Sequence, residues 1–298
     1  MTAAAAEPGR PATPGTLSWG RRFLMCPPRH FGVLYEINPW MQRTVRVDPE
    51  RALEQWESLA ATLRAAGAEV ETMAPDPSVP DLVFTANAGL VNGGQFVPSH
   101  FRHPERQAET PIDTRWFTGR GWRVDRLPEG MDHEGAGDAL PFTAGDGPTV
   151  LLSGYAPRSD VAAATALSDL LDCPVRSVEL VDPRLYHLDL TFCPLDDRRA
   201  MIAPLGWDRY GRAVVEHLVP EPLVLTDEEA LAFCANSVVV DRTVVMPNVP
   251  VRVGRLLEAW GFGPVECRVD EFLKAGGGCR CLTLALDVVL SPTAPPPP

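Results

Sequence analysis

The 298-residue sequence has no apolar run of the roughly 18 residues that a helix needs to cross a bilayer. Residues 1–18, MTAAAAEPGRPATPGTLS, have no continuous apolar segment behind a basic start and do not resemble a secretory signal. The seven cysteines are an odd number without regular spacing, which is typical of free thiols and not of a disulfide framework. The sequence therefore predicts a cytosolic location and no association with a membrane.

Positive charge is scarce, because 27 Lys and Arg residues face 39 Asp and Glu residues and the formal net charge is −12 at pH 7. This balance repels phosphate backbones, so it excludes nucleic acid as a partner and favours a small cationic ligand. The glycine motifs that hold nucleotide phosphates, G-x-x-x-x-G-K-[ST] and G-x-G-x-x-G, are also missing. The sequence leaves the oligomeric state open, including a homo-oligomer.

Both ends of the chain differ in composition from the part between them. Residues 1–19 are rich in Ala, Pro and Gly, and residues 291–298 read SPTAPPPP. Proline has no N–H group and stiffens the chain into polyproline II, so neither end predicts a helix or a strand. We expect a disordered tail over 1–19, a single folded domain over 20–290 and a proline-rich tail over 291–298.

Five amphipathic segments predict helices, and a short strand-like segment follows each of them. The helix starts are about 40–55 residues apart, which is typical of a repeated supersecondary unit. The expected helices lie at 49–66, 105–122, 160–173, 208–219 and 250–262, and the strands that follow at 68–73, 122–127, 174–180, 222–226 and 264–270.

Further strands are expected between the helices, at 82–91, 149–154, 188–195, 237–247 and 281–290. The segment SVVVDRTVVM predicts a hairpin, because two valine-rich runs flank the two-residue turn Asp241-Arg242. A hairpin argues against the alternative of an all-parallel doubly wound sheet. We therefore expect an α/β fold in which five strand-rich units, each with one helix, form a radial array.

The segment AGGGCRCLTLAL at 275–286 places Cys279 and Cys281 one residue apart after three glycines. Two cysteines without a second pair do not favour a zinc site, and a disulfide between them would close a strained ring. A nucleophilic thiolate is the remaining interpretation, with the glycines leaving an approach path for substrate. If the segment is a strand, Cys279, Cys281 and Thr283 share one face, so the pattern does not choose between the cysteines.

Three polar segments offer partners for a thiolate. In YHLDLTF, strand periodicity places His187 and Asp189 on one face. A structural histidine–carboxylate pair is the better explanation of an isolated H-x-D, but this one is accompanied by the segments that follow. In HEGAGDAL, Glu134 and Asp138 flank a glycine-rich turn that lets a ligand approach closely. In FTANAGLV, Asn87 interrupts an apolar run, where it either binds a ligand or satisfies the backbone at a bulge.

Together, the segments MCPPRHFGVLYEINPWM, DLVFTANAGLV, HEGAGDAL, GYAPRSD, YHLDLTF and GGGCRCLTL resemble, in order, the guanidine-modifying superfamily of arginine deiminases, dimethylarginine dimethylaminohydrolases and amidinotransferases. The resemblance covers about residues 20–290. It implies the pentein fold, a five-bladed α/β-propeller of ββαβ-type repeats with one catalytic domain. This fold agrees with the five units counted above.

The resemblance also implies roles for individual residues. Cys281 lies in the Gly-Gly-x-x-Cys-Leu-Thr pattern of the family's nucleophile, and Cys279 becomes its neighbour. His187 and Glu134 correspond to the remaining catalytic residues, with His187 protonated so that it favours the thiolate. The residues implied in substrate binding are Asp189, Asn87, Asn38 of the INPWM loop, Arg158 for the substrate carboxylate and Arg106 for the same carboxylate.

Two departures from the citrulline-forming members bear on the product. Those members usually have Asp where this chain has Asn87, and their acidic turn E-G-G-D is lengthened here to E-G-A-G-D. Both features resemble the arginine dihydrolase branch, which converts arginine to ornithine, ammonia and carbon dioxide without a cofactor. The alternatives are a dimethylarginine dimethylaminohydrolase, an arginine deiminase, an amidinotransferase and a non-catalytic propeller that binds arginine.

Overall fold

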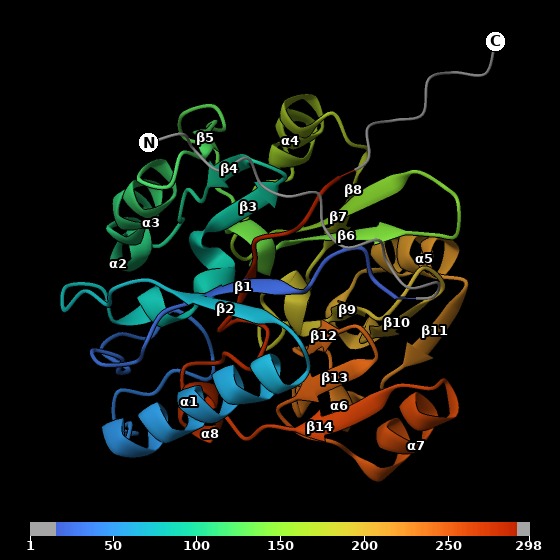
Figure 1. The fold of residues 1–298 in the computed structure, drawn as a ribbon. Coiled ribbons are helices and arrows are strands. Elements are labelled where there is room, and N and C mark those ends of the chain that lie inside the picture. Colours follow the sequence, from blue (N-terminus) through green and yellow to red (C-terminus); the bar gives the residue numbers. More distant parts are fainter. Residues whose placement is uncertain (1–15, 291–298) are drawn as a thin grey trace.

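In the computed structural model, which describes residues 16–290, five three-stranded sheets are arranged around one axis (Figure 1). The helices lie at the periphery of this ring, outside the sheets. The strands are β1 (Arg22–Met25), β2 (Glu69–Thr72), β3 (Gly89–Asn92), β4 (Gln95–Pro98), β5 (Arg123–Val124), β6 (Ala139–Thr143), β7 (Thr149–Tyr155), β8 (Val175–Glu179), β9 (Phe192–Pro194), β10 (Arg199–Ile202), β11 (Glu221–Val224), β12 (Val238–Val240), β13 (Thr243–Met246), β14 (Gly263–Glu266) and β15 (Leu284–Ala285).

Every sheet repeats one connection. An inner strand pairs antiparallel with a middle strand, and a helix then leads to an outer strand that lies parallel to the middle one, as in β12, β13 and β14. A parallel neighbour requires such a crossover, whereas the antiparallel pair needs only a tight turn. The Asp241-Arg242 turn joins β12 to β13 and pairs Val240 with Thr243, so the hairpin prediction is confirmed.

Five helices provide the crossovers, at the places that the sequence predicts. They are α1 (Pro49–Ala65), α3 (Glu109–Thr118) with the short α2 (Pro104–Gln107) before it, α4 (Ala163–Leu171), α5 (Arg209–Leu218) and α7 (Val251–Ala259); the short helices α6 (Asp227–Leu231) and α8 (Asp270–Leu273) lie in other connections. Pro111 falls in the first turn of α3, where its missing N–H costs no helical hydrogen bond. Asp48 caps α1 by accepting hydrogen bonds from the backbone N–H groups of Glu50 and Arg51.

The two ends of the described chain close the ring. β15 pairs antiparallel with β1 and β2 pairs parallel with β1, so the first sheet contains residues from both ends. Leu17 and Trp19 are buried, which moves the start of the packed chain ahead of residue 20, where the sequence placed it. The rest of the predicted N-terminal tail and the whole C-terminal tail lie outside the described residues. No helix within 16–290 is long and apolar enough to cross a membrane.

Three of the expected strands are shorter than predicted, because a turn precedes each inner strand. A 3₁₀ helix, η2 (Thr85–Ala88), occupies the middle of 82–91, and another, η4 (Leu188–Leu190), begins 188–195. Residues 279–282 form a turn, closed by a hydrogen bond from the Thr283 N–H group to the Arg280 carbonyl. The strand-parity arguments for His187, Asp189 and the two cysteines were therefore wrong, although the segments do come together.

Candidate active site

The turns that precede the five inner strands converge near the axis of the ring. They bring together Asn87 from η2, Glu134 before the 3₁₀ helix η3 (Gly135–Gly137), Asp189 from η4, Asn236 before β12, and Cys281 before β15. Because each sheet repeats the same connection, equivalent turns meet at the same end of the axis. The cavity at this point is lined by Ile37, Asn38, Met41, Asp81, Phe84, Asn87, Arg106, Arg158, Tyr186, His187, Ala275, Gly277 and Cys281.

The Cys281 thiol lies in this cavity and is almost fully buried. It donates a hydrogen bond to Asp189 Oδ2 at 3.3 Å, and Asn236 Nδ2 donates one to the sulfur at 3.1 Å. Burial, followed by the Asp189 charge, raises the pKa of Cys281 well above its ordinary value, while Asn236 acts in the opposite direction. The thiol is therefore neutral in the free protein, and a positive charge bound beside it is needed to release its proton.

Asn236 is a site residue that the sequence analysis missed. Its Oδ1 accepts hydrogen bonds from the backbone N–H groups of Arg280 and Cys281, at 3.1 and 3.2 Å, while its Nδ2 contacts the sulfur. The amide therefore fixes the turn that carries the nucleophile. A signal was present, because FCANSVVV at 233–240 repeats the pattern of FTANAGLV at 84–91, with the asparagine before an apolar strand in both.

The glycines before Cys281 are required by close packing. A Cβ atom on Gly277 would lie 2.3 Å from the ring of Phe84, and one on Gly278 would lie 2.7 Å from Asn236 Oδ1. Gly276 has φ +82°, in the left-handed region that favours glycine. The glycine run therefore lets the nucleophile turn approach its neighbours. Of the three glycines, Gly277 is the one that also lines the cavity, which agrees in part with the approach path expected from the sequence.

Glu134 joins two of the predicted site residues. Its Oε2 accepts hydrogen bonds from Arg158 Nη1 at 2.9 Å and from His187 Nε2 at 2.8 Å, and all three side chains are buried. Burial alone would raise the pKa of Glu134, but the positive charge of Arg158 and the His187 hydrogen bond outweigh it and lower the pKa well below its usual range. Glu134 is therefore ionised at neutral pH.

His187 is neutral in the free protein, contrary to the sequence-based expectation of a protonated imidazole. Burial lowers its pKa to about 4, although Glu134 acts to raise it. Since the ionised Glu134 accepts the hydrogen bond, Nε2 carries the ring proton and Nδ1 holds a free lone pair. His187 is thus in the form that accepts a proton, and it becomes an acid only after it has taken one.

Asn87 and Arg106 form a second buried group. The Asn87 side chain donates to the Glu134 carbonyl at 2.9 Å and accepts from Arg106 Nη1 at 3.0 Å. The Nε and Nη2 groups of the same guanidinium donate to the two carboxylate oxygens of Glu109 at 2.8 Å each. The amide of Asn87 therefore bridges the Glu134 backbone and Arg106, and an Asp at this position would lack the donor.

Asn38 lines the cavity together with Ile37 and Met41 of the same segment. Its Nδ2 donates to the Ala275 carbonyl at 3.0 Å, and its Oδ1 accepts from the Trp40 N–H group at 2.9 Å. Arg158 Nη2 also donates to the carbonyl of Ile37 in this segment at 3.0 Å. The predicted substrate-binding residues Asn38 and Arg158 thus hold this segment over the cavity.

Asp81 is a further cavity residue that the sequence analysis missed. Its Oδ2 accepts a hydrogen bond from Tyr35 at 2.9 Å, while its Oδ1 is buried without a partner. Glu134 Oε1 and Asp189 Oδ1 are also buried without partners. Three buried carboxylates, one in the cavity lining and two hydrogen-bonded to lining residues, thus keep an acceptor free. A ligand rich in N–H groups would satisfy these acceptors. Within 16–290, no three His, Cys, Asp or Glu side chains are grouped to hold a metal ion.

Cys279 is fully buried on the other side of the nucleophile turn, where its thiol donates to the Cys267 carbonyl at 3.5 Å. All seven cysteines of the chain are free thiols, as predicted. Because Cys279 does not line the cavity, we expect Cys279→Ala to retain turnover within about twofold and to lose about 1 kcal/mol of stability to the small void. Steady-state kinetics and thermal unfolding measure both effects, and loss of turnover in a folded variant would reassign the nucleophile.

The chain matches known proteins over nearly all of its folded part. Residues 36–288 match the family model "N,N dimethylarginine dimethylhydrolase, eukaryotic". The bifunctional arginine dihydrolase/ornithine cyclodeaminase AgrE of Nostoc sp. is 42% identical over 266 residues, 88% of this chain and 37% of the relative. The N(G),N(G)-dimethylarginine dimethylaminohydrolase of Mycobacterium tuberculosis is 38% identical over 287 residues, 95% of this chain and 91% of the relative.

Solved structures agree with the fold. The N-terminal domain of ArgZ, a cyanobacterial arginine dihydrolase, in a cysteine-to-serine variant bound to substrate, has a TM-score of 0.86 and 39% identity, and the match covers 91% of this chain and 99% of that one. The chain spans only 37–38% of the bifunctional relatives AgrE and ArgZ, the latter from Synechocystis sp.. The predicted resemblance and fold are confirmed, and the protein belongs to the N,N-dimethylarginine dimethylhydrolase family.

Proposed function

We propose that this protein hydrolyses the guanidinium group of L-arginine, or of a close derivative, through a covalent bond to Cys281. The observation that carries the proposal is a set of three buried carboxylates with free acceptor oxygens. Asp81 lines the cavity that holds the thiol, and Glu134 and Asp189 hydrogen-bond to residues that line it. A guanidinium is planar, permanently charged and rich in N–H donors, so it complements such acceptors. The net charge of −12 also favours a cationic substrate.

The binding roles follow from the charges at the cavity. Asp189 accepts a hydrogen bond from the nucleophile, and Glu134 accepts one from His187, which lines the cavity, so the two carboxylates would hold the guanidinium plane beside Cys281. Arg158 and Arg106 are the two cations that line the cavity, and they would bind the carboxylate at the other end of the substrate. Asp81 lies beside Arg106, whose Nη2 donates to the Asp81 carbonyl at 3.4 Å, and its free oxygen would accept the substrate's ammonium group.

The first hydrolysis begins when the bound cation favours the thiolate and the thiol proton passes to Nδ1 of His187. Cys281 Sγ attacks the guanidinium carbon, a C–N bond breaks, and His187 passes a proton to the departing nitrogen as ammonia. A water molecule, which returns a proton to His187, then cleaves the thiouronium intermediate and frees the thiol. The product of this step is citrulline, and no cofactor takes part.

In a second hydrolysis, the thiol attacks the ureido carbon of citrulline and a second ammonia leaves. Water cleaves the resulting thiocarbamate, and the carbamate that forms loses carbon dioxide to give ornithine. We infer that Asn87 permits this step, because a neutral amide beside a neutral ureido group leaves no unpaired charge, whereas an Asp would. One arginine and two waters thus yield one ornithine, two ammonia and one carbon dioxide.

Product analysis tests this proposal. Purified protein is incubated with arginine and, separately, with citrulline, and ammonia, citrulline and ornithine are measured over time. We expect ornithine from both substrates, with two ammonia per ornithine from arginine, and an adduct on the 275–286 peptide by mass spectrometry. Stoichiometric citrulline with no ornithine after prolonged incubation would exclude the dihydrolase reaction and leave a deiminase.

The second candidate function is a dimethylarginine dimethylaminohydrolase, because the Mycobacterium tuberculosis relative with that name aligns along nearly the full length of both chains. Release of dimethylamine from N-dimethylarginine, with little turnover of arginine, would favour it. Turnover that depends on an added amine would indicate an amidinotransferase, and binding of arginine without any turnover would indicate a non-catalytic propeller. The cytosolic location and any homo-oligomer stay predictions.

The raised pKa of Asp189 predicts how kcat/KM for arginine depends on pH. Burial raises the pKa of Asp189 to about 7, although the Cys281 hydrogen bond and the Arg280 charge act to lower it. As the pH falls through this value, Asp189 takes a proton and loses the charge that holds the guanidinium, so kcat/KM for arginine should fall about tenfold per pH unit. Initial rates at low arginine concentration, measured at constant ionic strength, check this; a kcat/KM that is flat down to about pH 5 would contradict it.

A further inference from the structure

Arg280 is a buried cation without an ion-pair partner in the described part of the chain. Its side chain is in the interior, with only 4% of the residue exposed, yet no carboxylate lies within 4.0 Å of its guanidinium, as one does for the buried Arg106 and Arg158. Its Nε has no hydrogen-bond partner. Burying an unpaired charge costs several kcal/mol, and arginine cannot shed its charge by losing the proton. An arrangement this unfavourable suggests that Arg280 has a function in the protein.

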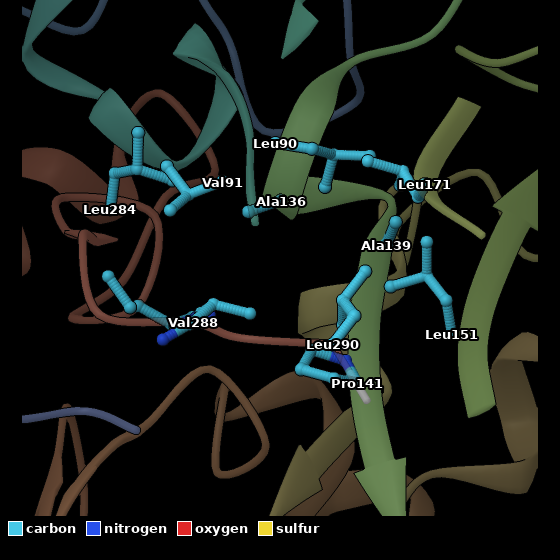
Figure 2. Close-up of a pocket in the computed structure, with 12 residues that line it drawn as sticks. Leu90, Val91, Ala136, Ala139, Pro141, Leu151, Leu171, Leu284, Val288 and Leu290 are labelled. Carbon is cyan, nitrogen blue, oxygen red and sulfur yellow. The ribbon is translucent and has the colours of Figure 1, made fainter. Parts of the chain in front are cut away.

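The surroundings of Arg280 are mostly apolar: they comprise an aromatic ring and two small cavities, one of which also contains a serine and a cysteine. The guanidinium lies 5.1 Å from the ring centre of Trp19. On another side it borders a small cavity behind the active site, in which Leu90, Ala139, Val288 and their neighbours point toward one another (Figure 2). Arg280 is the one polar residue among the twelve that line this cavity, which has room for about one water molecule. Little solvent therefore screens the charge, and its field extends further than at the surface.

The charge of Arg280 acts on Asp189 and on the neighbouring thiol of Cys281. Burial lowers the pKa of Arg280, and among the carboxylates that act to raise this pKa Asp189 acts more strongly than Asp287. Asp287 already accepts hydrogen bonds from the backbone N–H groups of Gly20 and Arg21, at 3.0 and 2.8 Å. Asp189, by contrast, keeps one oxygen unpaired and shares the proton of Cys281 through the other.

The backbone of Arg280 is fixed to the same site. Its N–H group donates to the Asn236 carbonyl at 3.2 Å and to Asn236 Oδ1 at 3.1 Å, the amide that also contacts the Cys281 sulfur. The side chains of the adjacent residues 280 and 281 therefore extend from one rigid turn, with the thiol in the substrate cavity and the guanidinium in the apolar cavity behind it.

We propose that Arg280 is the countercharge of the Cys281–Asp189 pair: it favours the ionised carboxylate of Asp189 in the free protein and, once the substrate cation is bound, the thiolate of Cys281. The proposal rests on the function proposed above, and Arg280 acts through Asp189 and the thiol without touching the substrate. Together, Asp189 and a thiolate would place two negative charges 3.3 Å apart, which is unfavourable without a cation nearby. The bound substrate supplies one positive charge from the substrate cavity, and Arg280 supplies a second from the apolar cavity.

The positive charge of Arg280 predicts the direction in which the pKa values of Asp189 and Cys281 change when that charge is removed. A cation favours the ionised forms of both a carboxylic acid and a thiol, so its removal raises both pKa values. In Arg280→Met, which keeps an unbranched apolar stem, the acidic inflection of kcat/KM should move upward by about one pH unit. The inflection for alkylation of Cys281 in the absence of substrate should move upward by a similar amount. Arg280→Lys keeps the charge, so the inflections of kcat/KM and of Cys281 alkylation should both stay close to their wild-type values.

The experiment measures both inflections in the full chain with Cys279→Ala, so that Cys281 is the one thiol of the 275–286 peptide. Iodoacetamide alkylation of that peptide is followed by mass spectrometry across the pH range, and kcat/KM for arginine is measured in the same buffers. Arg199→Met is the matched control, because Arg199 also lies 5.1 Å from a tryptophan ring, that of Trp260, but outside the site. It should leave both inflections unchanged.

The two readouts separate this inference from the proposed function. An upward shift of the alkylation inflection in Arg280→Met supports the countercharge even if no guanidino compound is hydrolysed. Unchanged inflections in a folded Arg280→Met protein that hydrolyses arginine more slowly at every pH would overturn it, since that result describes a merely structural residue. If Arg280→Met does not fold, Arg280→Gln removes the same charge, and the same shift is expected.

Discussion

Replacing Cys281 by serine is expected to lower kcat for arginine by at least about 10³-fold. The structure places the Cys281 sulfur in the cavity with hydrogen bonds to Asp189 and Asn236. A serine hydroxyl has nearly the size of the thiol but ionises far less readily, so the bound cation cannot release its proton. Substrate binding should be retained, because the carboxylates that hold the guanidinium are unchanged. Stopped assays of ammonia and ornithine, with binding of arginine by calorimetry, measure the two effects.

Cys279→Ser is the matched control for this variant, since it makes the same substitution two residues away, outside the cavity. It should retain most of the wild-type turnover. If Cys281→Ser were instead as active as Cys279→Ser, a covalent mechanism through Cys281 would be excluded. Arginine binding without turnover in the wild-type protein itself would favour the non-catalytic propeller.

Replacing Glu134 by glutamine is expected to lower kcat/KM for arginine by about 10³-fold. The Glu134 carboxylate pairs with Arg158 and His187, and its second oxygen is buried and unpaired in the free protein. The amide keeps the shape but removes the charge that the guanidinium needs and leaves Arg158 as an uncompensated buried cation. We also expect the free energy of unfolding to fall by about 3 kcal/mol for that reason.

Steady-state kinetics and chemical denaturation measure these effects together. Glu229→Gln is a suitable control, because Glu229 also pairs with an arginine, Arg252, but lies in α6 away from the cavity. Circular dichroism must show that Glu134→Gln is folded before its kinetics are interpreted. A folded Glu134→Gln protein with kcat/KM within tenfold of the wild type would remove Glu134 from the catalytic machinery.

The repeat in the sequence was sufficient to predict the fold. Each of the five amphipathic segments became a crossover helix, and each short strand after it became the outer strand of a sheet. These elements form because interactions between residues close in the sequence stabilise them. Asp48 caps α1, and valine-rich runs flank the turn at Asp241-Arg242. The resemblance to a known family then located all eight predicted site residues, and the structure places every one of them in or beside a single cavity.

The errors concern segments whose conformation depends on distant contacts. Periodicity predicted strands through His187, Asp189 and Cys281, but these residues lie at or within turns that precede the inner strands. Strand parity therefore gave no valid reason for the side chains to meet. They meet because five equivalent turns point toward one axis, and that arrangement exists only when the ring has closed.

The sequence by itself determined the five repeats and the identities of the candidate nucleophile, acids and bases. Only the tertiary structure decided which polar groups find partners. Asn236 contacts a sulfur 45 residues away in the chain, Asp81 keeps a free oxygen, and Arg280 keeps a free charge. The physical reason is that ionisation and hydrogen bonding in a buried site depend on desolvation and on neighbouring groups from other sheets. A linear sequence shows neither the depth of burial nor the distances between such groups.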